Sequence, residues 1–142
     1  KEGLLPLTQN ALLTLPNLAY HGYEGVALNL DERERLVRDL KIGGLIFFQG
    51  GPTKQAELTN RYQALAKTKL LISIDGEWGV AMRLKDSTIA FPYQLTLGAI
   101  QDNKLIERMG VEVAKQCRRL GIHVNFAPVV DVNNNPKRNI AK

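Results

Sequence analysis

Residues 70–75 read Leu-Leu-Ile-Ser-Ile-Asp and run directly into Gly76. Apolar residues in nearly every position, rather than in every second one, predict a strand that is buried on both faces, as in a parallel sheet. The same pattern occurs in residues 44–49 (Gly-Leu-Ile-Phe-Phe-Gln) and in residues 122–130, which lead to Asp131. The sequence therefore predicts three buried strands, each with a polar residue at its carboxyl end.

Helical patterns fill the intervals between these strands. Residues 31–40 combine an apolar side with acidic residues in the first turn, which favours a helix. Pro52 suits the first position of a second helix, which we expect to run to about Ala66. A long irregular stretch, residues 76–97, precedes a third helix over residues 102–120 with an aspartate as its N-cap. Strands that alternate with helices predict right-handed βαβ units and a parallel sheet.

The first 30 residues follow neither pattern clearly. Residues 4–15 suit either a helix or an extended arm, and residues 25–28 suit a short strand. We therefore divide the chain into an uncertain N-terminal segment, residues 1–30, and one α/β domain, residues 31–142. A length of 142 residues is enough for one domain with a real core and too short for two large domains.

The composition is that of an ordinary globular protein. Hydrophobic residues make up 44% and charged residues 23%, and no apolar run reaches the roughly 20 residues that span a bilayer. The net charge of +5 comes from basic residues that are spread along the chain among acidic neighbours. Because no basic stripe with interleaved aromatic residues occurs, we expect no nucleic-acid partner. Because no sufficiently long apolar run occurs, we expect no membrane span.

Motifs for metals and nucleotides are missing from the sequence. A zinc site needs three or four suitably spaced ligands, and nucleotide sites need glycine-rich motifs; neither pattern occurs. Cys117, the only cysteine, lies among the apolar positions of a predicted helix. We therefore expect no metal, no nucleotide cofactor, and a buried, unreactive thiol.

The strand ends are where a ligand is expected. In parallel α/β folds, ligands bind at the carboxyl ends of the strands, and the three predicted strands offer Gln49, Asp75 and Asp131 there. The densest group of polar residues follows the second of these strands, from Asp75 to Arg83. This segment is the candidate site.

Two interpretations of this segment remain open. The Asp75 carboxylate can accept two hydroxyl groups at once, as a sugar offers them, and Arg83 can return from the loop to bind a carboxylate, carbonyl or phosphate. Trp78 then forms a stacking wall. In the alternative, Asp75 and Arg83 form a salt bridge that only pins the loop, and Trp78 is a core residue.

The remaining polar features suit structural roles better. His123 lies in the middle of an apolar strand, which favours a hydrogen-bonded core or inter-layer histidine over a catalytic one. His21 has no assigned role. Residues 49–51 (Gln-Gly-Gly) suit a tight turn better than a small anion nest. A small α/β domain that binds a phosphorylated metabolite at this turn is therefore the weakest hypothesis.

Four stretches of the chain together resemble one family. They are residues 42–48 (Ile-Gly-Gly-Leu-Ile-Phe-Phe), residues 71–79 (Leu-Ile-Ser-Ile-Asp-Gly-Glu-Trp-Gly) with Arg83, Phe91-Pro92 with residues 96–99 (Thr-Leu-Gly-Ala), and residues 121–133 (Gly-Ile-His-Val-Asn-Phe-Ala-Pro-Val-Val-Asp-Val-Asn). In this order they resemble the N-terminal domain of glycoside hydrolase family 3. The closest resemblance is to its bacterial β-N-acetylglucosaminidase (β-N-acetylhexosaminidase) branch, over about residues 40–136.

The resemblance implies an α/β fold, the N-terminal half of a TIM-type (β/α)8 barrel in which parallel strands alternate with helices. It implies a retaining hydrolase that forms a glycosyl-enzyme and needs no cofactor. The implied substrate is terminal β-N-acetylglucosamine in oligosaccharides or cell-wall muropeptides. The compartment is undetermined, although the tryptophan-containing motif is typical of exported relatives and favours an extracytoplasmic location.

The resemblance also implies roles for single residues. Asp75 is expected to bind sugar hydroxyls, and Arg83 to contribute to the same subsite. Glu77 and Asp131 match motif positions near the site and are expected to support it. Trp78 stands where many members have glycine, which narrows or reshapes the pocket.

The family's nucleophile and its acid/base loop lie beyond the turn at Pro136, so we assign no catalytic residue in this chain. A complete barrel needs about 250 residues, so the 142 residues here supply about half of one. We therefore expect a fragment that is inactive by itself and whose open sheet edges favour self-association. The alternative hypothesis is a non-catalytic half-barrel module that oligomerises or binds sugar without hydrolysis.

Overall fold

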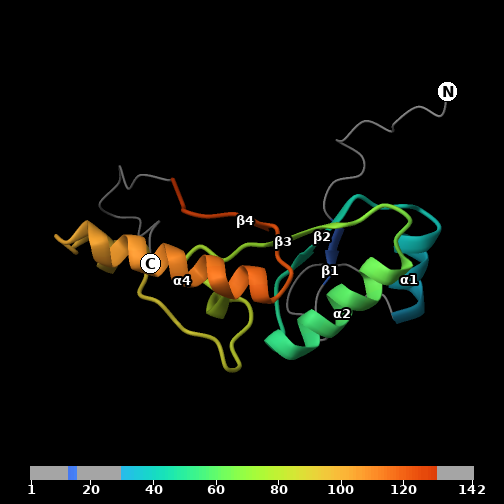
Figure 1. Ribbon diagram of the computed structural model, residues 1–142, viewed down its shortest axis with the longest axis horizontal. Coiled ribbons are helices and arrows are strands. Elements are labelled where there is room, and N and C mark those ends of the chain that lie inside the picture. Colours follow the sequence, from blue (N-terminus) through green and yellow to red (C-terminus); the bar gives the residue numbers. More distant parts are fainter. Residues whose placement is uncertain (1–12, 16–29, 131–142) are drawn as a thin grey trace, which may run out of the picture.

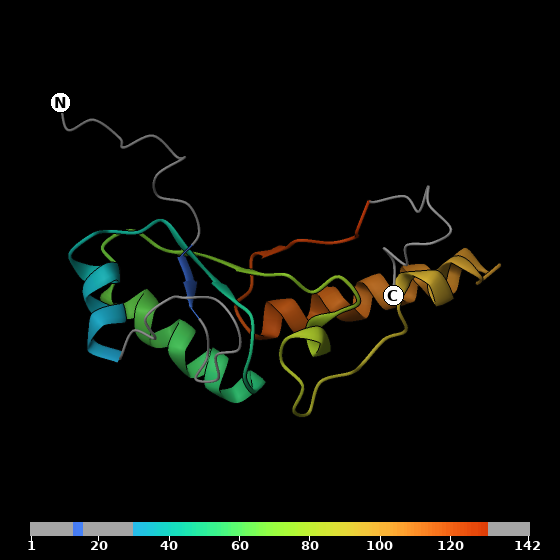
Figure 2. The ribbon, with the colours of Figure 1, turned by 180° about the vertical axis from the view of Figure 1, so that it is seen from behind.

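The computed structural model describes residues 13–15 and 30–130 (Figure 1). The elements of this part are β1 (Leu13–Leu15), α1 (Leu30–Arg38), β2 (Gly44–Phe47), α2 (Pro52–Leu65), β3 (Leu71–Ile74), the 3₁₀ turn η1 (Val80–Met82), α3 (Gln94–Gly98), α4 (Asn103–Arg119) and β4 (Val124–Asn125). The strands form one sheet in the order β1-β2-β3-β4, and every neighbouring pair is parallel. Seen from both sides, α1, α2 and α4 lie on one side of the strands (Figures 1 and 2). The prediction of an α/β fold with parallel strands is therefore confirmed.

β2 and β3 form the centre of the core. Leu45 pairs with Ile72 and Phe47 pairs with Ile74, and all four side chains are completely buried. Ser73, the polar residue of β3, is also completely buried and donates its hydroxyl hydrogen to the backbone oxygen of Leu45 at 3.1 Å. The continuous apolar runs therefore mark the centre of the core, as predicted.

The helix ends follow the local sequence. α2 begins at Pro52, where its missing N–H costs no helical hydrogen bond. The Asp102 carboxylate accepts a hydrogen bond from the backbone N–H of Lys104 at 3.0 Å and so caps α4. Gly121, with φ of 70°, ends this helix in the left-handed conformation that glycine adopts at no steric cost. The two predicted helix starts, at Pro52 and after Asp102, are confirmed.

The strand predicted over residues 122–130 is much shorter than expected, because β4 covers only Val124–Asn125. One more backbone bond follows, from the N–H of Phe126 to the oxygen of Ile74 at 2.9 Å. Its partner strand β3 then ends, and Pro128 has no N–H to donate to a sheet. An apolar run without a neighbouring strand therefore stays irregular.

The long segment and the helix between β3 and β4 also differ from expectation. Residues 76–97, predicted to be irregular, contain η1 and the beginning of α3. On α4, Cys117 is the buried residue, whereas Leu105 is 48% exposed because the first turns of the helix extend beyond the strands (Figure 1). The buried thiol was predicted correctly, and its burial raises the pKa of Cys117.

His123 is exposed, so its predicted place in the core is wrong. The imidazole Nδ1 of His123 accepts a hydrogen bond from the backbone N–H of Ile72 at 3.0 Å, and the backbone N–H of His123 donates to the Ile72 oxygen at 2.8 Å. The ring takes the place of a strand carbonyl at the start of β4. The prediction that His123 is hydrogen-bonded is therefore confirmed, and its purely structural role stays a prediction.

Several predictions fall outside the described residues. They concern His21, Asp131, the possible strand over residues 25–28, and most of residues 4–15, of which β1 is the described and extended part. Within the described residues, no helix combines the length and the apolar character needed to cross a membrane.

The Tyr62 phenol on α2 is a buried polar group. The side chain is completely buried, and its hydroxyl finds no partner in the part of the chain that the structure describes. Burial raises the pKa of Tyr62, and the neighbouring Arg33 opposes this only in part. The lack of a hydrogen-bond partner among the described residues destabilises the neutral hydroxyl in the folded state, and burial destabilises its ionised form.

Tyr62→Phe is therefore expected to stabilise the protein by about 1 kcal/mol, measured by urea unfolding near neutral pH. Because the pKa of Tyr62 is higher in the folded than in the unfolded chain, the native protein loses stability as the pH rises above about 10. The variant should lose less over the same range. A destabilised variant, or an unchanged alkaline loss, would contradict this account of Tyr62.

Candidate functional site

Asp75 and Arg83 meet at the carboxyl end of β3. The Arg83 guanidinium forms an ion pair with Oδ2 of Asp75, and its Nε–H donates to the Asp75 backbone oxygen at 2.8 Å. The Asp75 side chain is 27% exposed and the Arg83 side chain is 23% exposed, so solvent or a ligand can reach the pair. The prediction that these two residues lie together is confirmed, and their role in binding stays a prediction.

An aromatic ring that the sequence analysis did not assign to the site completes this pair. The guanidinium carbon of Arg83 lies 4.8 Å from the centroid of the Phe48 ring, a distance typical of a cation–π contact. The β2–β3 register pairs Phe47 with Ile74, so Phe48 and Asp75 come next at the same end of the sheet. The position of Phe48 at the end of a predicted strand was the sequence feature that could have identified it as a site residue. Gln49, the predicted end residue of this strand, is exposed.

The turn after Asp75 is held by the side chain of Asn125 from β4. The backbone N–H of Gly76 donates to Oδ1 of Asn125 at 2.9 Å, and Nδ2 of Asn125 donates to the Gly76 oxygen at 3.1 Å. The same oxygen accepts the N–H of Gly79 at 2.9 Å. Asn125 was not among the predicted site residues, because its motif position alone does not show which backbone it faces.

The next two residues tie the site to α3. The Trp78 ring is half-buried and packs edge to face on Tyr93, with centroids 4.7 Å apart. The backbone oxygen of Glu77 accepts a hydrogen bond from Nε2 of Gln94 at 2.6 Å. Trp78 is therefore not the core residue of the alternative hypothesis, and its action as a stacking wall stays a prediction.

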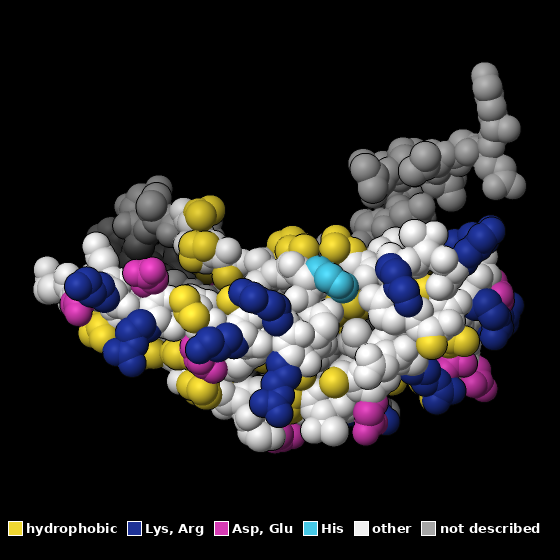
Figure 3. All heavy atoms as spheres, in the orientation of Figure 1, with side chains coloured by type: hydrophobic (Ala, Val, Ile, Leu, Met, Phe, Trp, Pro, Cys, Tyr) yellow, Lys and Arg dark blue, Asp and Glu magenta, His cyan; other side chains and the backbone are white. Residues whose placement is uncertain are grey.

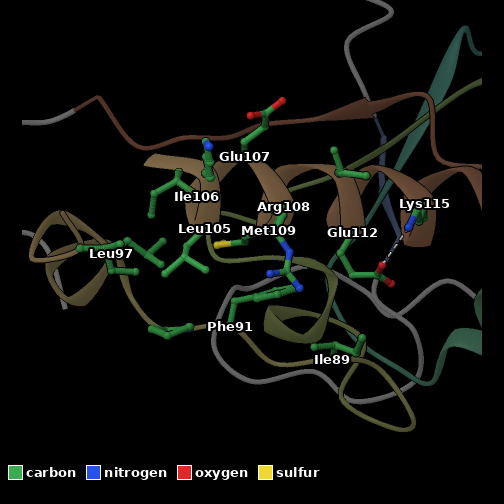
Figure 4. Close-up of a pocket in the computed structure, with 14 residues that line it drawn as sticks. Ile89, Phe91, Leu97, Leu105, Ile106, Glu107, Arg108, Met109, Glu112 and Lys115 are labelled. Atoms are coloured by element: carbon green, nitrogen blue, oxygen red, sulfur yellow. Dashed lines mark ion pairs between the residues drawn. The ribbon is translucent and has the colours of Figure 1, made fainter. Parts of the chain in front are cut away.

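Two hollows lie near this region, and neither is lined by Asp75 or Arg83. A cavity of about 560 Å³ between α4 and β4 is bordered by Gly76, Glu77 and Asn125 among others. A groove of about 880 Å³ runs between α4 and the segment over residues 89–100 (Figure 4). Its lining is mainly apolar, and an ion pair of 3.5 Å between Glu112 and Lys115 lies at its rim. Such a lining offers few of the convergent hydrogen-bonding groups that a sugar needs.

Charge and metal chemistry point to no competing site among the described residues on the face shown in Figure 3. On the face shown in Figure 3, lysine and arginine side chains are scattered, and acidic side chains lie among them. Among the described residues, no three histidine, cysteine, aspartate or glutamate side chains are close enough to hold a metal ion. The Asp75–Arg83 pair is thus the candidate site that the geometry supports best.

The fold and the site define an α/β protein with a parallel sheet and a carboxylate–arginine pair at the end of one strand. The model of the glycosyl hydrolase family 3 N-terminal domain matches residues 17–142, which is most of the chain. The chain therefore belongs to glycosyl hydrolase family 3, as the motif resemblance predicted. The match begins within the segment that we left uncertain, residues 1–30.

Individual relatives agree with this family. A beta-hexosaminidase of Nitrosomonas eutropha is 33% identical over 118 residues, which cover 77% of this chain and 34% of that protein. The solved structure of a glycoside hydrolase family 3 beta-N-acetylglucosaminidase from Paenibacillus sp. str. FPU-7 is 31% identical with a TM-score of 0.69, and the match covers 94% of this chain and 26% of that one. The chain thus spans about a third or less of the length of these relatives.

A second kind of relative matches a short segment. A protein of Caulobacter vibrioides whose name assigns it to class 2 aldolases is 75% identical over 40 residues, which cover 28% of this chain and 16% of that protein. This similarity covers too little of either protein to assign a fold or an activity.

The shape of the 75–83 segment depends on Gly79. Its φ is 102°, and a Cβ atom there would lie 2.8 Å from Cδ2 of Phe91. Gly79→Ala is therefore expected to destabilise the protein by at least about 1 kcal/mol, measured by urea unfolding.

Gly110 on α4 is the matched control, because a Cβ atom there would meet nothing within 4 Å. Gly110→Ala should stabilise the helix by up to about 1 kcal/mol. Equal effects of the two substitutions would show that the Gly79 turn does not constrain the loop.

Proposed function

We propose that Asp75 and Arg83 form part of the subsite that binds a terminal β-N-acetylglucosamine unit in a retaining glycoside hydrolase. Family membership implies a carbohydrate substrate, and the beta-hexosaminidase and beta-N-acetylglucosaminidase relatives support this sugar. The observation that carries the proposal is the partly exposed Asp75 carboxylate, held at the end of β3 by Arg83.

The geometry suits recognition of hydroxyl groups. Arg83 contacts Oδ2 of Asp75, and within the described residues no hydrogen bond occupies Oδ1. An ionised carboxylate oxygen with free lone pairs accepts hydrogen bonds from neighbouring sugar hydroxyls. The remaining guanidinium N–H groups of Arg83 can donate hydrogen bonds to hydroxyl or carbonyl oxygens of a bound sugar.

The described residues account for binding rather than for bond cleavage. A retaining mechanism needs a carboxylate nucleophile and an acid/base group on either side of the glycosidic bond. We assign neither role to a described residue.

The arrangement of the sheet supports a larger architecture. Consecutive strands that are neighbours, parallel and followed by helices on one side are the repeating unit of a (β/α)8 barrel. We propose that this domain is the N-terminal half of such a barrel, which places the end of β3 at the face where barrel enzymes bind their substrates.

Asp75→Ala is expected to raise the dissociation constant for N-acetylglucosamine about 10- to 100-fold, because hydrogen bonds to a charged group are lost. Hydrolysis of a chromogenic N-acetylglucosaminide by the complete protein should be abolished. Calorimetric titration and a colorimetric assay measure the two effects.

Arg83→Lys and Glu57→Ala are the comparison variants. Arg83→Lys keeps the charge but loses the planar fork, so its binding should be intermediate. Glu57 makes an exposed ion pair with Lys54 on α2, and Glu57→Ala should bind as the unaltered protein does. Normal binding and turnover by Asp75→Ala would overturn the proposed function.

A second candidate function is a half-barrel module that self-associates without hydrolysis. Two observations favour it. β4 has a partner strand on only one side among the described residues, and apolar side chains near it are exposed, Phe126 by 46% and Val130 by 86%. Open edges and exposed apolar surface favour pairing with a second chain.

Sedimentation equilibrium distinguishes the two candidates. The self-association hypothesis expects a dimer or larger species at micromolar concentration. A monomer that unfolds cooperatively would contradict both self-association and the expectation that a half barrel needs a partner.

A further inference from the structure

The backbone ladder between β3 and β4 ends one residue before the candidate site. Its last bond runs from the N–H of Phe126 to the oxygen of Ile74 at 2.9 Å. Beyond this bond, the Asn125 side chain takes the place of backbone partners and forms two further hydrogen bonds, both with the backbone of Gly76. We propose that Asn125 is the positioning residue for Asp75, a role that rests on the proposed sugar-binding function.

The residues on both sides of Asp75 are fixed by β4. Ile74 before it is bound through Phe126, and Gly76 after it is bound through Asn125. The remaining backbone acceptor of this stretch, the Asp75 oxygen, takes the Nε–H of Arg83 at 2.8 Å. Phe126, Asn125 and Arg83 therefore together set the direction in which the Asp75 carboxylate points. Of these three, Asn125 is the residue whose side chain binds the backbone of the turn after Asp75.

Only an amide side chain fits this position. Asparagine presents one acceptor and one donor at the same end, which match the N–H and the oxygen of a single residue. An aspartate keeps the acceptor and loses the donor. The approach is also close, because a Cβ atom on Gly76 would lie 3.1 Å from Oδ1 of Asn125. The Gly79 backbone oxygen lies equally close, at 3.1 Å, so glycine at 76 is required by both neighbours.

Loss of the Asn125 amide would act locally. Gly76 is buried, so its N–H and oxygen would lose a partner away from bulk solvent. The cavity of about 560 Å³ that borders both residues would let water reach them. The turn would loosen, and with it the Asp75 backbone that receives the Nε–H of Arg83.

The experiment compares Asn125→Ala with Ser73→Ala. Ser73 lies on β3, two residues before Asp75. Its hydroxyl donates a buried hydrogen bond to the backbone oxygen of Leu45, which lies on β2 and not on β4. Both variants lose buried hydrogen bonding, but only the first touches the turn. Urea unfolding measures their stabilities, and all further comparisons are made well below their melting temperatures.

Two readouts report on the site. The hydrogen exchange rate of the Arg83 Nε–H, followed by NMR, reports the contact with Asp75 without any sugar. We expect it to rise about tenfold or more in Asn125→Ala and to change less than about twofold in Ser73→Ala. Titration with N-acetylglucosamine should show a dissociation constant about tenfold higher in Asn125→Ala alone.

The two arms separate the failure of this inference from the failure of the proposed function. Absence of sugar binding by the unaltered protein would overturn the function, whereas the exchange arm would still test the positioning. An unchanged Arg83 exchange rate in Asn125→Ala would overturn the inference, as would equal effects of both variants. Should Asn125→Ala not fold, Asn125→Asp enters the same comparison, and we expect a smaller acceleration because it keeps the Gly76 N–H acceptor.

Discussion

The parallel register between β2 and β3, which pairs Phe47 with Ile74, determines where the candidate binding groups lie. Because parallel strands end at the same edge of a sheet, this register places Phe48 beside Asp75. Arg83 can then contact both, the ring of the first and the carboxylate of the second. A slip of β2 by one residue would turn Phe48 to the opposite face of the sheet from Asp75.

The core and the site depend on the same strands for different reasons. Burial of Leu45, Ile72 and their neighbours holds the register in place, because a slip of one residue would move every side chain of the slipped strand to the other face of the sheet. The polar groups begin where the apolar runs stop. A group such as Asp75 is therefore oriented by a rigid core behind it and by hydrogen bonds from the next strand in front of it.

Much of this arrangement could be predicted from the sequence. Continuous apolar runs predicted β2 and β3, Pro52 and Asp102 predicted helix starts, and a strand-end carboxylate with Arg83 predicted the pair. These features are local or nearly so. The contribution of Asn125 and the short extent of β4 could not be predicted in this way, because both depend on which backbone lies opposite. His123 shows the same limit, since an exposed imidazole that replaces a strand carbonyl has no signature in the hydrophobic pattern.

The central claim is that sugar binds at the end of β3, and its most direct test is the mapping of amide NMR shifts during titration with N-acetylglucosamine. The account predicts that the largest changes fall on residues 75–83 and on Phe48, which touches Arg83. Changes confined to the groove along α4, around residues 104–112, would contradict it. So would the absence of any change at sugar concentrations that saturate a millimolar site.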